Sequence, residues 1–194
     1  SLIYKPTLSI LSCLIKYDKT KNKIEDLDLN FFWEKKNLTN KNYKKLHNFY
    51  WLFTIDLKSS NKITQSIIEN WIDKFQKYNP DSWQIDILSK RTISWIANTK
   101  ITYEGSDNSY KNKFDKLINK QINHLINEIS KSKTVDNKML GCTAIIMGGL
   151  SYNNEKFLSY GLGLLKKIIN SSFDSNYFPK SRSISQLVFY LKYF

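Results

Sequence analysis

Apolar residues recur every three or four positions along most of the chain, the spacing that lines one face of an α-helix. Leu46, Tyr50, Phe53 and Leu57 follow this spacing and predict a helix over about 41–57. The same pattern predicts six more helices, one that ends before the turn 78–81 and others over about 83–99, 109–131, 136–147, 154–170 and 186–194. The sequence therefore predicts an all-α protein.

Polar and turn-forming residues indicate where these helices begin and end. The stretch Tyr78–Asp81 contains a proline, which disfavours helix in the residue before it, so we expect a turn there. Asp107 or Ser109 can cap the long helix that follows residue 108, because each offers a side-chain oxygen to free backbone N–H groups. The pair Gly148 and Gly149 is expected to close the helix that precedes it.

The connections between these helices are short, so sequential helices should lie antiparallel, as a stack of hairpins. A hydrophobic content of 41% supports a sizeable core, and only 6 glycines and 3 prolines in 194 residues favour long helices over many tight turns. A hairpin stack can be a bundle, an α-solenoid or a closed α/α toroid. Helical periodicity alone does not distinguish these three architectures.

The chain is strongly basic, with 30 Lys and Arg against 17 Asp and Glu and a net charge of +13. This charge favours polyanionic partners such as nucleic acid, acidic glycan or an anionic membrane surface. Only Arg91 and Arg182 are arginines. Because base-edge recognition in DNA relies on arginine forks, we expect no nucleic-acid partner. An alternative is that the lysines simply cover solvated faces, as in a protein encoded by an AT-rich genome.

Other common classes of site are not indicated. Cys13 and Cys142 lie on apolar stretches without metal-ligand or C-x-x-C spacing, so buried free thiols are expected. No phosphate loop, Ser-His-Asp arrangement or zinc spacing is present, and we predict neither cofactor nor metal. No apolar run reaches the roughly 18 residues of a membrane span. The compartment stays open between periplasm and cytoplasm.

Four short motifs carry a resemblance to a known family. They are LHNFYWL at 46–52, SKRTISWI at 89–96, DNKML at 136–140 and DSNYFPKSRS at 174–183. In order and spacing they resemble the N-terminal helical domain of the bacterial heparinase II/III-like polysaccharide lyases, over about residues 27–194.

The resemblance implies a fold and a reaction. The family's helices form an incomplete α/α toroid, here expected over residues 31–194 after an N-terminal helical or linker segment at 1–30. The family cleaves uronic-acid polysaccharides, such as glycosaminoglycans or alginate, by β-elimination. A C-terminal β-sandwich supplies further catalytic residues, and we expect it beyond residue 194, because the final apolar residues have no later chain to cover them.

Site residues follow from the matched motifs. Asn137 matches the family's carboxylate-facing asparagine, and Lys138 stands where many members have histidine. With Arg182 and Ser183 matched to the family's R-S pair, the position of its catalytic tyrosine falls on Gln186, a departure from the pattern. With Lys180 and Ser181 matched instead, that position falls on Ile184. Tyr190, one helical turn after Gln186, is the substitute we predict. The predicted catalytic residues are thus Asn137 and Tyr190, with Lys138 and Gln186 binding substrate.

The other motifs suggest further substrate-binding residues. His47, Trp51 and Trp95 can contact or stack on sugar rings, although aromatic residues at helical spacing more often belong to a core. His124 lies on an apolar face and is predicted to be structural.

The two arginines extend this predicted binding surface. Arg182 belongs to the fourth motif. Arg91 can form a fork for a carboxylate, or instead pair with Asp86 or Glu128.

Three functions compete. The first is a carbon-oxygen lyase acting on acidic polysaccharide, and the second is a non-catalytic relative that binds acidic glycan during synthesis or export of a cell-surface polysaccharide. The third is a helical-repeat scaffold that binds nucleic acid. Glutamine at position 186, where the family has its catalytic tyrosine, is the feature that distinguishes the first function from the second. The scarcity of arginine argues against the third.

Overall fold

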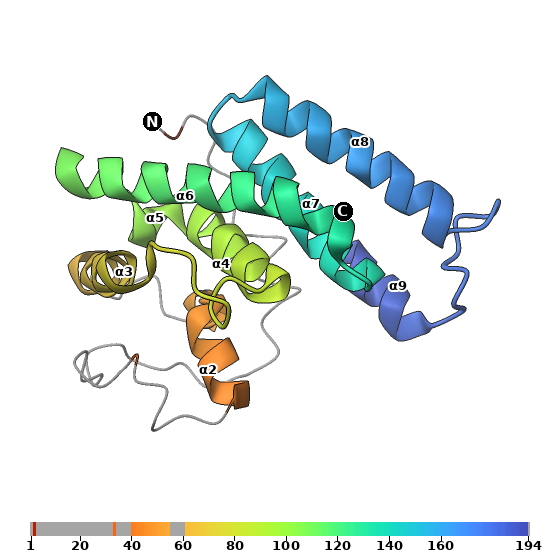
Figure 1. The fold of residues 1–194 in the computed structure, drawn as a ribbon, viewed down its shortest axis with the longest axis horizontal. Coiled ribbons are helices and arrows are strands. Elements are labelled where there is room, and N and C mark those ends of the chain that lie inside the picture. Colours follow the sequence, from red (N-terminus) through yellow and green to blue (C-terminus); the bar gives the residue numbers. More distant parts are fainter. Residues whose placement is uncertain (1, 3–32, 34–39, 55–60, 194) are drawn as a thin grey trace.

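A computed structural model describes residues 2, 33, 40–54 and 61–193 of the chain (Figure 1). All regular elements within this part are helical, which confirms the predicted all-α class. The predicted segment 1–30 and Cys13 lie outside these residues, apart from Leu2. The elements are α2 (Asn40–His47), η3 (Tyr50–Thr54), α3 (Asn61–Phe75), α4 (Ile85–Ala97), α5 (Thr99–Thr102), α6 (Asn108–Glu128), η4 (Ile129–Lys131), α7 (Val135–Ser151), α8 (Glu155–Ser172) and α9 (Ile184–Leu191).

Successive long helices run antiparallel. Thr92 of α4 donates a hydrogen bond to Gln121 of α6, whereas Trp95, later in α4, stacks on Phe114, earlier in α6. Gly141 of α7 lies against Ile129, just after the end of α6, and the later Gly148 lies against the earlier Ile122. Because α4 and α7 both run against α6, they are parallel to each other.

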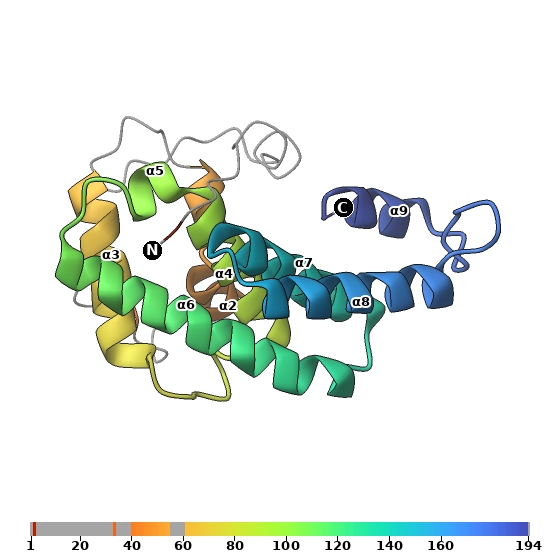
Figure 2. The same cartoon turned by 90° about the horizontal axis from the view of Figure 1, so that it is seen from above.

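Helix α9 is also parallel to α7. Gln186 contacts Asp136 near the start of both helices, and Tyr193 contacts Thr143 two turns further along. In Figure 1, α4, α7 and α9 all begin towards the lower right. Figure 2 shows α9 set apart from α6, on the far side of α7.

Burial separates central from peripheral helices. Helix α4 buries ten of its 13 residues, whereas α8 buries only Phe157, Gly161 and Ile168 of its 18. Cys142 lies buried between α7 and α8, and its thiol donates to the Gly161 carbonyl at 3.2 Å. Burial raises the pKa of this thiol to about 12, so the predicted buried thiol is confirmed for Cys142.

The predicted helix over 41–57 is wrong at its centre. Helix α2 ends at His47, and η3 begins only at Tyr50. Phe49 adopts a left-handed backbone with φ of 57°, which no helix accommodates. Its ring is fully buried among tryptophans, including Trp71 and Trp95, and this packing compensates the backbone strain.

The predicted end of the fifth helix is also wrong, because α7 continues through Gly148 and Gly149 to Ser151. The glycines serve close packing instead. A Cβ atom on Gly149 would lie 2.7 Å from the backbone nitrogen of Leu158 in α8. Only glycine therefore allows the two helices to approach this closely.

Two other boundaries agree with the sequence. Asp107 caps α6 by accepting from the Tyr110 N–H at 2.8 Å, as one of the two predicted caps. Asn79 accepts from the N–H groups of Asp81 and Ser82, which closes the predicted turn. Among the described residues, no helix combines the length and apolar character needed to cross a membrane.

Candidate functional site

The predicted residues fall into two groups, and the first lies where the parallel helices α7 and α9 begin. Thr134 caps α7 by accepting from the Asn137 N–H at 3.4 Å, and Ser183 caps α9 in the same way, accepting from the Gln186 N–H at 3.3 Å. The Gln186 side-chain amide donates to the Asp136 carboxylate at 3.1 Å. Asn137 and Gln186, predicted from motifs far apart in the sequence, are thus brought to adjacent helical turns.

The other members of this group differ in exposure. Lys138 is half-buried in the first turn of α7. Tyr190 is buried, and its ring lies 5.3 Å from that of Phe173. Burial and the Asp136 carboxylate raise the pKa of Tyr190, an effect that the side chains of Gln186 and Ser172 partly offset. The phenol is therefore neutral at physiological pH and can donate a hydrogen bond or a proton.

Arg182 lies outside this group, in the segment between α8 and α9. Its guanidinium pairs with Asp174 at 2.7 Å, and its side chain is 69% exposed. Backbone N–H groups of Phe178 and Asn176, together with Arg182, hold the pKa of the Asp174 carboxyl below its usual range. The pair organises this loop on the surface.

The second group of predicted residues is buried in the core. The Trp71 indole N–H donates to His47 Nδ1 at 3.0 Å, and one Arg91 nitrogen donates to the carbonyls of His47 and Ser82, both at 3.0 Å. The Arg91 guanidinium lies over the Trp71 ring, 4.1 Å from its centroid. Trp95 is also fully buried.

Arg91 does not make either of the predicted ion pairs. No carboxylate of a described residue pairs with it, and Glu128 instead pairs with Lys131 at 2.7 Å. Two of its guanidinium nitrogens, Nε and Nη2, have no hydrogen-bond partner among the described residues. Burial lowers the pKa of Arg91 to about 9, so it carries a buried charge at neutral pH, balanced by two carbonyls and the Trp71 face.

Several residues predicted to contact substrate are buried. His47, Arg91 and Trp95 lie inside the described structure and offer no surface to a glycan. Trp51 is half-buried, with its indole N–H donating to the Leu46 carbonyl at 3.1 Å. Any role of the buried three in binding is therefore one of supporting the residues around them.

We expect His47 to make the protein less stable in mild acid. Burial, followed by the Arg91 charge, lowers the pKa of His47 to about 3, so the folded protein keeps the imidazole neutral while the unfolded chain protonates below about 6.5. Stability is then lost as the pH falls through 6.5, by about 2 kcal/mol between pH 7.5 and 5.0. Urea unfolding of the wild type and His47→Gln across this window measures the difference.

Glutamine retains an acceptor for Trp71 without titrating, so this variant should lose most of the pH dependence. His124→Gln is the matched control. Burial also lowers the pKa of His124, but this side chain is only partly buried, so its replacement should change the pH dependence of stability less. If the free energy of unfolding changes equally with pH in wild type and His47→Gln, His47 is not the group that destabilises the protein in acid.

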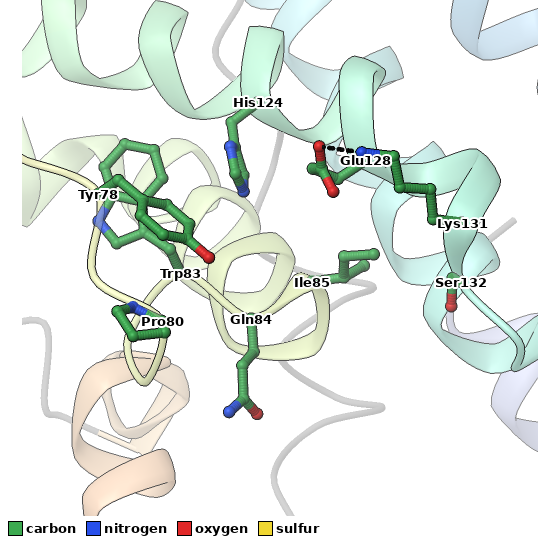
Figure 3. Close-up of a pocket in the computed structure, with 9 residues that line it drawn as sticks. All are labelled: Tyr78, Pro80, Trp83, Gln84, Ile85, His124, Glu128, Lys131 and Ser132. Atoms are coloured by element: carbon green, nitrogen blue, oxygen red, sulfur yellow. Dashed lines mark hydrogen bonds and ion pairs between the residues drawn. The ribbon is translucent and has the colours of Figure 1, made fainter.

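A surface pocket lies beside the start of α4 (Figure 3), with a volume of about 210 Å³. Figure 3 shows Tyr78 and Trp83 close together, with the His124 ring beside them and the Glu128–Lys131 pair across the opening. The pocket is lined by Tyr78, Pro80, Trp83, Gln84, Ile85, His124, Glu128, Lys131 and Ser132.

This pocket combines an accessible ring with polar groups. Tyr78 is 64% exposed, whereas Trp83 is almost fully covered. The His124 ring lies 5.2 Å from Trp83 and 5.5 Å from Tyr78. A hydrogen bond from Lys131 holds the pKa of Glu128 below its usual range, so its carboxylate is ionised. Sequence reasoning missed this pocket, although His124 and the Tyr78–Asp81 turn were both recognised separately.

Within the described part of the chain, no group of three histidine, cysteine, aspartate or glutamate side chains is placed to hold a metal ion. No protein-family model, curated protein or solved structure matches the chain.

Proposed function

We propose that this chain is the helical domain of a heparinase II/III-like lyase that binds an acidic polysaccharide where α7 and α9 begin. The observation that carries the proposal is the contact between Gln186 and Asp136, which places the position of the family's tyrosine beside the motif that contains Asn137.

The helix arrangement supports the same proposal. Helices α4, α7 and α9 are parallel, while α6 and α8 run the opposite way, an alternation expected of an α/α toroid. We propose that the parallel helices form its inner layer. Their N-terminal ends carry partial positive charge, which favours an acidic polymer.

In this site Asn137 would hold the uronate carboxylate through its side-chain amide. Lys138, in the same turn, would offset the charge that develops on the carboxylate during β-elimination. Tyr190 would donate a proton to the departing 4-linked oxygen, which requires α9 to shift because the hydroxyl group is buried in this structure. The proton next to the carboxylate would pass to a base of the β-sandwich domain that the resemblance implies.

One observation favours the alternative, a non-catalytic protein that binds acidic glycan. Gln186 occupies the family's tyrosine position, and an amide transfers no proton. Tyr190 is buried, and its raised pKa makes it a poor base. Binding without elimination would need only Asn137, Lys138 and the positive helix ends.

One experiment separates these possibilities. The protein is incubated with uronic-acid polysaccharides, and the ultraviolet absorbance of unsaturated uronate ends is followed. Rising absorbance supports the lyase. Flat absorbance together with retention of the protein on an acidic-glycan column supports the binding alternative, and failure of both readouts rejects the proposal.

The pocket of Figure 3 extends the proposed glycan surface. We expect Tyr78→Ala to weaken retention on the glycan column roughly threefold to tenfold, because a sugar ring would lose its stacking partner. Thermal stability should barely change, since the ring is 64% exposed. Tyr160→Ala, on α8, is the control. Equal retention of wild type and Tyr78→Ala would exclude the pocket from binding.

A further inference from the structure

Lys90 is a half-buried lysine whose ammonium makes no hydrogen bond or ion pair with any described residue. It lies over the ring of Tyr50, 5.6 Å from the centroid. Burial lowers the pKa of Lys90, Asp86 one turn earlier opposes this, and Lys44 on α2 lowers it further. The Lys90 ammonium group is therefore partly removed from water.

Three elements converge on this position. Tyr50 belongs to η3, Lys90 to α4, and Tyr193 follows α9. The hydroxyl groups of Tyr50 and Tyr193 lie 2.7 Å apart, and Thr143 of α7 donates to the Tyr193 carbonyl at 3.0 Å. Four segments of the chain thus fix the surroundings of Lys90.

The contact between Tyr193 and Thr143 lies further along α7 and α9 than the proposed glycan site at the start of these helices. Tyr193 follows Gln186 by two helical turns, and Thr143 follows Asp136 by the same distance. At 1.5 Å per residue this is a separation of about 10 Å along the axes. An extended acidic polymer seated near Asn137 could reach it with a charged group.

The backbone next to Tyr50 is strained. Phe49 has φ of 57° and a fully buried ring, and the Asn48 side chain accepts from the Tyr50 N–H at 2.9 Å. This corner turns the chain out of the α2 helix and positions the Tyr50 ring under Lys90. Strained backbone of this kind is typical of functional sites.

We propose that Lys90 binds an anionic group of the polysaccharide, either a carboxylate or a sulfate. A partly desolvated ammonium group without a hydrogen-bond acceptor lowers stability. An anion bound by Lys90 removes this cost. The inference rests on the proposed function, because it names the residue that would recognise the acidic substituent.

The test compares wild type with Lys90→Met, which retains the length of the side chain without its charge. Calorimetry with an unsulfated uronate oligosaccharide and with a sulfated neutral oligosaccharide shows which anion is recognised. We expect about tenfold weaker binding of the preferred ligand. The melting temperature should stay equal or rise, because an unpaired ammonium has been removed from a partly buried site. Lys62→Met, an exposed lysine of α3, should change neither value.

Equal affinity of wild type and Lys90→Met would overturn the inference and leave the proposed function standing. A fall of several degrees in melting temperature would assign Lys90 a structural role and also overturn it. If wild type binds neither oligosaccharide, the proposed function fails. The anion site is then still tested by the NMR signal of ¹³C-methylated Lys90 during titration with inorganic sulfate, where a saturable shift supports the site and no shift rejects it.

Discussion

Replacing Arg91 by alanine is expected to lower the free energy of unfolding by roughly 3–5 kcal/mol. The side chain is fully buried, donates to the carbonyls of His47 and Ser82, and stacks on Trp71. Alanine leaves a cavity beneath the Trp71 ring and two carbonyls without their charged donor. Urea unfolding followed by tryptophan fluorescence measures the loss.

The chain offers a matched control in Arg182, its only other arginine. Arg182 is 69% exposed and paired with Asp174, so Arg182→Ala should cost less than about 1 kcal/mol. Arg91→Lys should lie between the two, because lysine retains the charge without the planar fork that stacks on an indole. A loss for Arg91→Ala no larger than for Arg182→Ala would show that the buried network contributes little to stability.

Asn137→Ala is expected to reduce any elimination activity by about 100-fold to 1,000-fold, the usual effect of removing one donor that stabilises a developing charge. The side chain is half-buried, and the helix cap uses the backbone N–H of Asn137, which alanine retains. Stability should therefore change little. Initial rates of unsaturated uronate formation, measured for both proteins at matched concentrations, give the ratio.

Asn127→Ala, an exposed asparagine of α6, is the control for this experiment and should retain full activity. Loss of activity in Asn137→Ala with an unchanged melting temperature would place the residue in the reaction. Unchanged turnover would show that the catalytic site lies elsewhere. If wild type is inactive but binds glycan, the same variant should weaken retention on the column.

The sequence predicted helices best where one face is apolar and the other polar. Helix α6 shows this contrast, and its predicted range of 109–131 is covered by α6 and η4. The break at Phe49 was not predictable, because Leu46, Tyr50 and Phe53 continue the helical spacing across it. Tertiary packing of the Phe49 ring determines the backbone there.

The candidate site was predictable only in part. Asn137 and Gln186 were expected to belong together, and they lie in adjacent turns. The burial of Arg91 was not expected, since a charged residue in a motif suggests a surface role. Helix α4 is buried on nearly all sides, and periodicity within one helix does not reveal how many neighbours surround it. The pocket at Tyr78 was missed for a similar reason, because it forms between a loop and the distant α6.

The helix dipoles of the molecule largely oppose one another, because α4, α7 and α9 point one way and the longer α6 and α8 point the other. The net charge of +13 therefore supplies the field that attracts a polyanion before contact. Since the Debye length is about 8 Å at physiological ionic strength, this attraction acts over a short range, and rates of association would fall steeply as salt is added.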